Sequence, residues 1–271
     1  MENKDIDIDK DNVKKKEKEN FTDVNKWDNY YINAEKNQTN PPWESQEVFH
    51  VLKDFFEDSN KYLNHKLHIE KNFLEKNENK MKIIELGSGS SYSSLWLASK
   101  GHDVTAVDIS PYAIKRAKNI DIKNTVNWVC MDIFDKNMFK ENNNDNINQF
   151  NNDNLDNIIS EESFDFIFDM QCFHVLKEIN CDLFCDIVFK LLKKGGKIMI
   201  VVGANIDSYA KDKIMEKSEN IKGPPKLFVD DFLIPFNKIG LKVISIKLSR
   251  FNSTIAYGNE PPLCWVGIFE K

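Results

Sequence analysis

Four acidic residues stand at the ends of four short apolar segments of the sequence. Glu85, Asp108, Asp132 and Asp169 each follow or close a segment that has the pattern of a buried strand. The carboxyl ends of parallel strands meet at one edge of an open α/β sheet, where such folds bind their ligands. Any one of these acids could be a helix cap or a surface charge. Four of them at one edge predict a binding site.

The elements that must position these acids alternate between strands and helices. This alternation predicts an α/β fold with a doubly wound, mostly parallel sheet covered on both faces. A helix is expected after each of the first two strands, at 92–100 and from Pro111, because proline suits the first helical turn. A further helix is expected at 183–192, closed by Gly195-Gly196. The expected strands are 81–86, 103–107, 126–131, 164–168 and 197–202, followed by a late hairpin of 243–248 and 263–269.

The turn after the first strand restricts the class of ligand. A nicotinamide dinucleotide favours G-x-G-x-x-G, but only Gly87 and Gly89 fit, and the third position is Tyr92. Glu85 would also repel a pyrophosphate. S-adenosylmethionine carries an ammonium and a sulfonium instead, so nearby acids favour it. Asp108 lies 21 residues after Gly87, close to the spacing of about 20 expected for an acid that binds ribose hydroxyls.

Residues 80–202 resemble a class I S-adenosylmethionine-dependent methyltransferase domain. The segments that carry the resemblance are Ile84-Glu85-Leu86-Gly87-Ser88-Gly89, Val107-Asp108-Ile109-Ser110, Asp132-Ile133 and Leu192-Lys193-Lys194-Gly195-Gly196-Lys197. The resemblance implies a Rossmann-like seven-stranded sheet with a C-terminal antiparallel hairpin, and S-adenosyl-L-methionine as the cofactor. It places the ribose on Asp108 and the adenine near Asp132 and Ile133. Ser91 stands where the first motif usually has its third glycine.

Three further segments resemble the thiopurine and thiol methyltransferase-like branch: Trp27-Asp28-Asn29-Tyr30-Tyr31 with Pro42-Trp43-Glu44, the stretch 164–174, and Gly223-Pro224-Pro225 before 230–236. In this branch an aromatic N-terminal segment folds over the cofactor, although the tryptophans could also simply pin a helix to the core. Relatives often have arginine and glycine after the fourth-strand acid, where this chain has Met170 and Gln171. The resemblance implies a cofactor-binding set of Trp27, Tyr31, Trp43, Glu85, Leu86, Gly87, Gly89, Asp108, Ile109, Asp132, Ile133 and Asp169.

Methyl transfer from a sulfonium is an in-line displacement with a neutral leaving group, so positioning contributes much of the rate. A thiol acceptor, with a pKa near ~8.5, needs little help from a base. His174 follows the fourth strand, where a base could face the methyl group, although a buried core histidine is the alternative. Asp169 could orient the substrate or the cofactor ammonium. Arg250 and Tyr257 could line the acceptor pocket or lie on the ordinary surface, and Cys172 is expected to pack.

The chain divides into three parts. Residues 1–20 are nearly all charged or amide side chains, which predicts a disordered polar tail. Residues 21–79 are predicted to form a helical segment that serves as the cofactor lid. Residues 80–271 are predicted to form the methyltransferase domain, with a disordered, low-complexity, asparagine-rich insertion at 136–162.

Composition narrows the function classes. The net charge of −6 argues against nucleic acid as a partner, and no apolar run is long enough to span a membrane. Five scattered cysteines without a C-x-x-C pair argue against a metal site or a disulfide framework. We expect a cytoplasmic monomer that methylates a small molecule, with a thiol as the candidate acceptor. The alternatives are a protein lysine methyltransferase, a non-catalytic binding subunit and, less favoured, a nicotinamide-dependent oxidoreductase.

Overall fold

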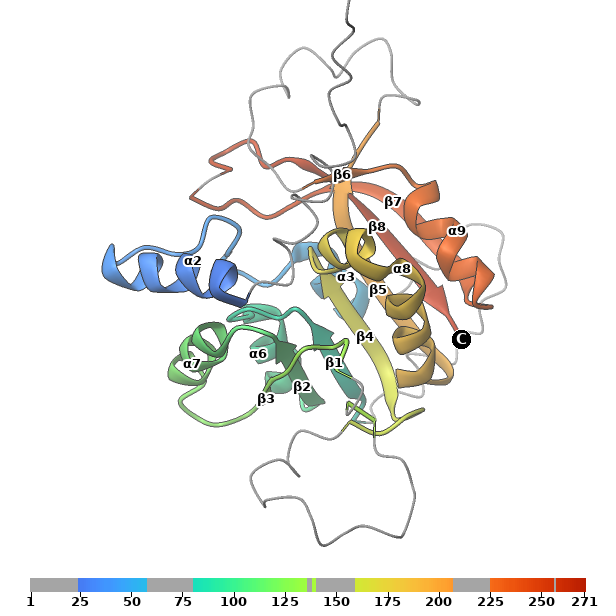
Figure 1. Ribbon diagram of the computed structural model, residues 1–271, viewed down its shortest axis with the longest axis horizontal. Coiled ribbons are helices and arrows are strands. Elements are labelled where there is room, and N and C mark those ends of the chain that lie inside the picture. The colour runs from blue at the N-terminus through green and yellow to red at the C-terminus, as the bar shows by residue number, and fades with distance from the viewer. Residues whose placement is uncertain (1–23, 58–79, 136–137, 140–158, 207–224, 256) are drawn as a thin grey trace, which may run out of the picture.

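The computed structural model describes residues 24–57, 80–135, 138–139, 159–206, 225–255 and 257–271. A single sheet crosses the molecule in the strand order β3-β2-β1-β4-β5-β8-β7, with the two-residue β6 paired to β5 (Figure 1). Its strands are β1 (Lys82–Leu86), β2 (Asp103–Asp108), β3 (Asn127–Cys130), β4 (Phe164–Met170), β5 (Leu192–Ala204), β6 (Lys226–Leu227), β7 (Lys242–Arg250) and β8 (Leu263–Glu270).

The central strands are parallel and the last two are not. β1 pairs in parallel with β2 and β4, whereas β8 pairs antiparallel with both β5 and β7. The predicted Rossmann-like, mostly parallel sheet of seven main strands and its C-terminal antiparallel hairpin are therefore confirmed. Because β1 lies between β2 and β4, the ends of these three strands meet at one edge.

Helices cover both faces of the sheet, as Figure 1 shows. They are α2 (Val24–Lys36), α3 (His50–Glu57), α6 (Tyr92–Ser99), α7 (Pro111–Ile120), α8 (Phe173–Leu191) and α9 (Asp230–Lys238). One apolar cluster packs α8 and α9 against the sheet, and a second packs α3, α6 and α7 against it. The central strands are buried on both sides, which explains their nearly continuous apolar sequences.

Helix α8 differs from its predicted range. The 183–192 pattern covers only its second half, because the helix begins at Phe173, directly after β4. Asn180 has non-helical backbone angles (φ −159°, ψ 88°) and kinks the helix, which interrupts the apolar periodicity. The helix ends at Leu191, before Gly195-Gly196, and those glycines lie inside β5.

The structure describes residues at both edges of the predicted insertion, 136–162. Met138 and Ile159 are both buried in the core, and Phe139 pairs with Ile159 through an isolated β-bridge. These apolar side chains therefore pack in the core on either side of the asparagine-rich residues. The asparagine-rich residues 140–158, the predicted tail at 1–20 and residues 58–79 lie outside the described residues.

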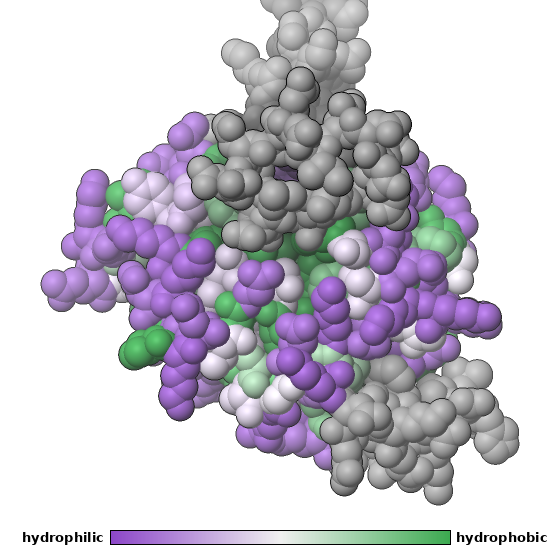
Figure 2. Space-filling model, turned by 90° about the horizontal axis from the view of Figure 1, so that it is seen from below, coloured by the Kyte–Doolittle hydropathy of each residue, from purple (hydrophilic) through white to green (hydrophobic). Residues whose placement is uncertain are grey.

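The surface is mixed in character. Figure 2 shows one face on which hydrophilic residues surround a smaller group of hydrophobic ones. None of the described helices combines the length and the apolar character needed to traverse a bilayer. All five cysteines carry free thiols.

Candidate active site

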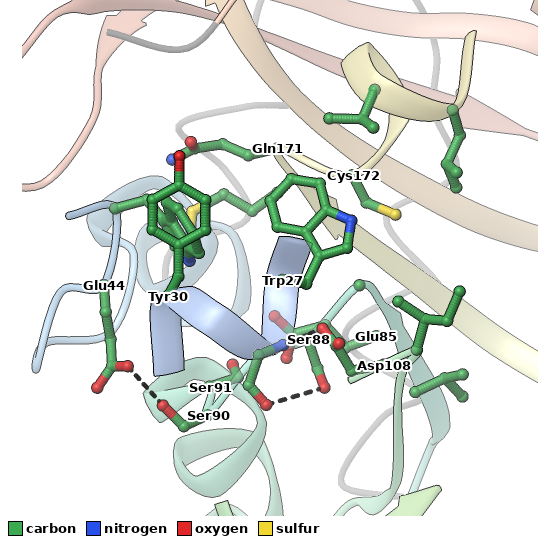
Figure 3. Close-up of a pocket in the computed structure, with 18 of the residues that line it drawn as sticks. Trp27, Tyr30, Glu44, Glu85, Ser88, Ser90, Ser91, Asp108, Gln171 and Cys172 are labelled. Atoms are coloured by element: carbon green, nitrogen blue, oxygen red, sulfur yellow. Dashed lines mark hydrogen bonds between the residues drawn. The ribbon is translucent and has the colours of Figure 1, made fainter. Parts of the chain in front are cut away.

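A cavity of about 420 Å³ opens where the carboxyl ends of β1, β2 and β4 meet. This volume suits a small-molecule ligand. One wall comes from the ends of β1, β2 and β3 and the turns after them. The opposite wall comes from the end of β4, the start of α8, Pro225 and Tyr257, and the N-terminal segment covers both (Figure 3).

The turn after β1 has glycine where no other residue fits. Gly87 and Gly89 have φ angles of +61° and +57°, in the left-handed region that side chains disfavour. A Cβ on Gly87 would lie 2.6 Å from the Cys172 side chain, and one on Gly89 would lie 2.6 Å from the Tyr31 hydroxyl. The Cys172 and Tyr31 side chains therefore lie closely against the two glycines, and a residue with a Cβ would collide with them.

The serine that replaces the third glycine has a structural role. The Ser91 hydroxyl accepts a hydrogen bond from the Ser94 amide at 3.0 Å and caps the N-terminus of α6. A hydroxyl acceptor at this position satisfies an amide that the helix itself leaves unpaired. The departure from the usual glycine pattern thus leaves the turn intact.

Asp108, at the end of β2, organises the turn and faces the cavity. Its two carboxylate oxygens accept hydrogen bonds from the Gly89 and Ser110 amides, each at 2.8 Å. Burial raises the pKa of Asp108, while these two amide bonds oppose that shift. Each oxygen retains a second lone pair for a ligand hydroxyl. Ser110 also caps α7, since its hydroxyl accepts from the Ala113 amide at 3.1 Å.

Glu85 is a buried acid with no basic partner among the residues that contact it. Its side chain is 2% exposed and accepts hydrogen bonds from the Ser94 and Ser91 hydroxyls. Burial raises its pKa to about 7, so that half of the protein carries a neutral Glu85 near that pH. A cation bound in the cavity would restore the charged form, because opposite charge favours ionisation.

Asp132 and Ile133, which follow β3, complete this wall. The Asp132 carboxylate accepts a hydrogen bond from the Phe134 amide at 2.9 Å, and this turn points both residues at the cavity. Ile109, which follows Asp108, lines the cavity between them. In total five acids and one lysine line the cavity: Glu44, Glu47, Glu85, Asp108, Asp132 and Lys26. This charge balance fits a cationic ligand.

Two residues of the predicted cofactor set lie elsewhere. Leu86 is fully buried in the core, because its side chain points to the opposite face of the sheet from that of Glu85. Asp169 is also fully buried and does not line the cavity. Its carboxylate accepts hydrogen bonds from the Phe173 amide at 3.0 and 3.2 Å. Asp169 therefore caps the start of α8, and its role in orienting substrate or cofactor stays a prediction.

His174 does line the cavity, and its environment disfavours the predicted role of a base. The residue is 5% exposed, and burial lowers its pKa to about 4. A base with such a low pKa holds a proton poorly at neutral pH. Among the described residues, its Nδ1 atom has no hydrogen-bond partner. The imidazole is thus neutral and can bind a polar group of a ligand.

The aromatic residues of the N-terminal segment form a cluster over the cavity. The ring centroid of Trp43 lies 5.7 Å from that of Trp27, 4.7 Å from Tyr30 and 6.4 Å from Tyr31. Trp27, Tyr31 and Trp43 were predicted to bind the cofactor, and the structure places all three in the cavity lining. Figure 3 shows Trp27 and Tyr30 on the side of the cavity opposite the ends of β1 and β2, where Glu85, Ser88 and Asp108 lie.

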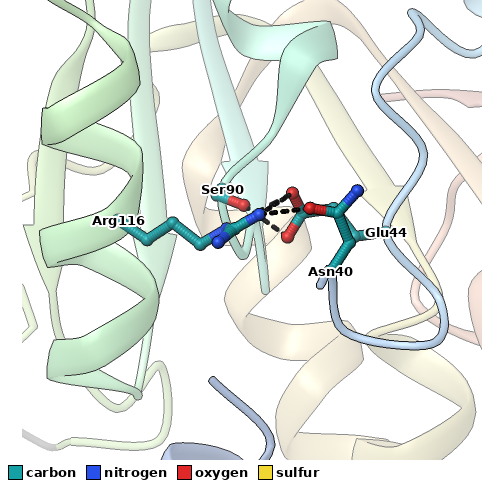
Figure 4. A network of polar contacts seen from close by, with 4 residues as sticks. All are labelled: Asn40, Glu44, Ser90 and Arg116. Atoms are coloured by element: carbon teal, nitrogen blue, oxygen red, sulfur yellow. Dashed lines mark hydrogen bonds and ion pairs between the residues drawn. The ribbon is translucent and has the colours of Figure 1, made fainter. Parts of the chain in front are cut away.

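Polar contacts tie the N-terminal segment to the edge of the sheet that forms the cavity. Glu44 accepts a hydrogen bond from Ser90 at 2.7 Å and forms an ion pair with Arg116 at 3.0 Å, and Arg116 also donates to Asn40 (Figure 4). In α2, Asp28 accepts a hydrogen bond from Ser110. Each contact joins the N-terminal segment to a residue beside the glycine turn or on α7.

Several cavity residues were missed from the sequence. Glu44, Ser90 and Gln171 all line the cavity, as does Cys172, which was expected only to pack. Of the two residues named for the acceptor pocket, Tyr257 lines the cavity, whereas Arg250 donates to the Pro261 carbonyl and does not. Glu44 directly follows the Pro-Pro-Trp segment, which was a usable signal. Gln171 has a φ of +71°, which is unusual for a side-chain-bearing residue, but nothing in the sequence marks it.

Comparisons with known proteins agree with this geometry. A family model described as a methyltransferase domain matches residues 77–230. A structure solved in a study of disulfide-to-thioacetal conversion during echinomycin biosynthesis has a TM-score of 0.57, with 17% identity over 85% of each chain. A S-adenosylmethionine-dependent methyltransferase from Methanosarcina mazei has a TM-score of 0.50, with 18% identity over 71% of this chain and 92% of that chain.

At these identities the two structures show a shared fold. No curated protein matches the chain. The family model covers more than half of the sequence, and the described residues supply what a cationic nucleoside cofactor needs: a glycine turn, acids at three strand ends and an aromatic cover. The chain therefore belongs to the methyltransferase-domain family, and it is an enzyme that uses S-adenosyl-L-methionine as its cofactor.

Proposed function

We propose that this enzyme transfers a methyl group to a small molecule and that the acceptor atom is a thiol sulfur, as in the thiopurine and thiol methyltransferase-like branch. The observation that carries the proposal is the electrical neutrality of the cavity wall after β4. Burial lowers the pKa of His174 to about 4 and raises that of Tyr257 to about 12. Burial also raises the pKa of the Cys172 thiol well above its usual value.

This wall therefore lacks a group that could accept a proton easily at pH 7. An alcohol acceptor would need such a base, because it does not ionise near neutral pH. A thiol has a pKa near ~8.5 and loses its proton to solvent often enough without one. The neutral wall thus favours an acceptor that ionises by itself.

The opposite wall binds the cofactor. Asp108 accepts hydrogen bonds from the ribose hydroxyls, Glu85 attracts the positive charge, and Asp132 with Ile133 borders the adenine. Bound S-adenosylmethionine supplies a methyl group on a positively charged sulfur, with a neutral leaving group. Gly87 and Gly89 give the turn the left-handed backbone that it needs, and Trp27, Tyr31 and Trp43 would exclude water from the reacting atoms.

His174 then acts by hydrogen bonding. Its neutral ring and unpartnered Nδ1 can orient the acceptor, which contributes through positioning. The covered cavity of about 420 Å³ suits a small molecule better than a protein side chain on its backbone. We further propose that the enzyme acts as a monomer, without nucleic acid or membrane partners, in the cytoplasm.

A radiolabelled methyl-transfer screen tests the acceptor. The purified enzyme is incubated with methyl-labelled S-adenosylmethionine and with thiols, small amines and protein extracts in separate reactions. We expect label in the thiol products, and the Asp108→Ala variant is the inactive control. Label transferred to amines or to protein lysines, with none on thiols, would contradict the proposed acceptor while leaving the cofactor assignment standing.

A further inference from the structure

The wall opposite the cofactor acids is notable for the charges that it lacks. It consists of Met170, Gln171, Cys172, His174, Val175, Leu176, Ile179, Pro225 and Tyr257. Among these described lining residues there is no aspartate, glutamate, lysine or arginine. All five of the cavity's acids and its one lysine come from other segments of the chain. The cavity thus has one charged wall and one uncharged wall.

Asp169, which is buried beneath the uncharged wall, is also held in its neutral form. Burial raises the pKa of Asp169 to about 8, although the Phe173 and Cys172 amides oppose the shift. A charged substituent on the acceptor would therefore lose its water and gain no opposite charge from this wall, which is costly. The apolar lining of Val175, Leu176 and Ile179 would instead gain from contact with an apolar body.

Besides His174, two polar side chains of the wall can bind an acceptor. The amide of Gln171 interacts with the Tyr257 hydroxyl, and both residues line the cavity. The backbone of Gln171 has a φ of +71°. The backbone N–H of Gln171 donates to the Val201 carbonyl at 2.9 Å, which fixes the backbone there. A glutamine kept in this disfavoured conformation at a ligand cavity indicates a functional constraint. Figure 3 shows its side chain opposite Glu85 and Asp108.

We propose that the wall formed by Gln171, His174 and Tyr257 binds an acceptor with an uncharged, largely apolar body, and that this specificity requires an uncharged side chain at position 171. This inference rests on the proposed function, because it concerns the body of the molecule whose thiol is methylated. Gln171 excludes charged acceptors because its amide offers hydrogen bonds without a compensating charge. The acceptor body lies against the apolar side chains at the start of α8.

Equilibrium binding of isosteric pairs tests this inference without requiring turnover. The protein is first saturated with S-adenosylhomocysteine, and calorimetry then measures binding of 3,3-dimethylbutane-1-thiol and of thiocholine, its trimethylammonium isostere. A second pair is 4-methylthiophenol and 4-mercaptobenzoate. We expect the neutral member of each pair to bind at least about tenfold more tightly, since desolvating an unpaired charge outweighs the small difference in shape.

Variants then locate the determinant. Gln171→Glu, which is nearly isosteric, should reduce the preference for 3,3-dimethylbutane-1-thiol over thiocholine by about tenfold, because opposite charges attract at close range. Ile122→Glu is the matched control. Ile122 is 92% exposed and does not line the cavity, so the same added charge there should leave the preference unchanged. Gln171→Met, which adds no charge, should also retain the preference for the neutral thiol.

The outcomes separate the two proposals. If the charged members bind as tightly as the neutral ones, or if Gln171→Glu leaves the preference unaltered, the inference is wrong. If S-adenosylhomocysteine binds but neither neutral thiol does, the apolar acceptor body is wrong and the cofactor assignment remains. If S-adenosylhomocysteine itself fails to bind, the proposed function fails and this inference fails with it.

Discussion

The two walls of the cavity treat buried acids in opposite ways. On the first wall, burial raises the pKa of Glu85 to about 7, and the carboxyl faces the cavity, where a cation can reach it. Beneath the second wall, burial raises the pKa of Asp169 to about 8, and the carboxyl faces the amides at the start of α8. Desolvation thus raises both pKa values; a cation in the cavity can oppose it at Glu85, whereas the amides at the start of α8 oppose it at Asp169.

An acid at a strand end is only a candidate ligand residue. Glu85 and Asp169 lie on neighbouring parallel strands that meet at one edge. What separates them is the chain that follows each strand. A glycine turn follows β1 and leaves Glu85 facing the cavity, whereas a helix begins four residues after Asp169 and takes up its carboxylate.

Substitution of Asp108 and of Asp169 should give the largest contrast in cofactor affinity. Asp108→Ala should weaken S-adenosylmethionine binding by about 2–4 kcal/mol, because two hydrogen bonds to a charged acceptor are lost. Asp169→Asn should change that affinity by no more than about twofold, because its carboxyl does not line the cavity and an isolated capping change has small effects at a distance. Calorimetry of both variants decides between them.

Asp108 also holds the Gly89 and Ser110 amides, so thermal unfolding must be measured alongside affinity. Asp103→Ala, at the exposed start of the same strand, is the control for a lost aspartate. A normal affinity in folded Asp108→Ala, or an affinity loss in Asp169→Asn as large as that in Asp108→Ala, would show that the two walls have been assigned wrongly.

The aromatic cover should contribute less than Asp108. Trp27→Ala should weaken binding of the sulfonium cofactor by roughly 0.5–2 kcal/mol, which is the range for a cation against an aromatic face. Tyr112→Ala is the control, since Tyr112 is a partly exposed aromatic residue outside the cavity lining. Binding assays with both variants measure the difference. Equal affinities for the Trp27→Ala variant and the unmodified enzyme would indicate that the tryptophan only packs against Trp43 and Tyr30.

Proton release on cofactor binding is the smallest expected effect and the most direct test of Glu85. Its pKa of about 7 in the ligand-free protein should fall when a cation binds beside it. Near pH 7 the carboxyl starts about half protonated, so binding should release roughly 0.5 proton. The sign follows from the shift: affinity should rise as pH increases through 7, because less free energy is then spent on removing that proton.

Calorimetry in buffers of different ionisation enthalpy measures this release. The α-amino group of the cofactor, with a pKa near ~7.7–8.0, should take up a small fraction of a proton in the opposite direction. Glu85→Gln separates the two, since it abolishes the release and keeps the uptake. If the release persisted in Glu85→Gln, another acid would have to be its source.

Much of the cofactor wall could be predicted from sequence because its residues are local to strand–turn–helix units. Gly87 and Gly89 follow β1 directly, and Asp108 closes β2, so one periodic pattern places both. The Ser110 cap and Pro111 likewise fix the start of α7. Leu86 and Asp169 lie outside the cavity lining, because a strand pattern gives the position of a residue and not the direction of its side chain.

The acceptor wall and the cover could be predicted only in part. Trp27, Tyr31 and Trp43 stood out as aromatic residues in a polar stretch, but their contacts with each other and with Gly89 depend on the path of the chain across the sheet. Gln171 and Tyr257 lie 86 positions apart in sequence and meet at one wall. No local pattern predicts such a meeting, because it depends on how β4 and the loop after β7 pack.

The amino-acid sequence alone therefore determined the order of strands and helices, the glycine turn and the acids at the sheet edge, since hydrophobic periodicity and turn chemistry act over a few residues. Only the tertiary structure decided which buried acid faces a ligand, that His174 is held neutral, and that the second wall carries no charge. The physical reason is that burial, which sets each of these pKa values, arises from segments that are distant in the chain and adjacent only in the fold.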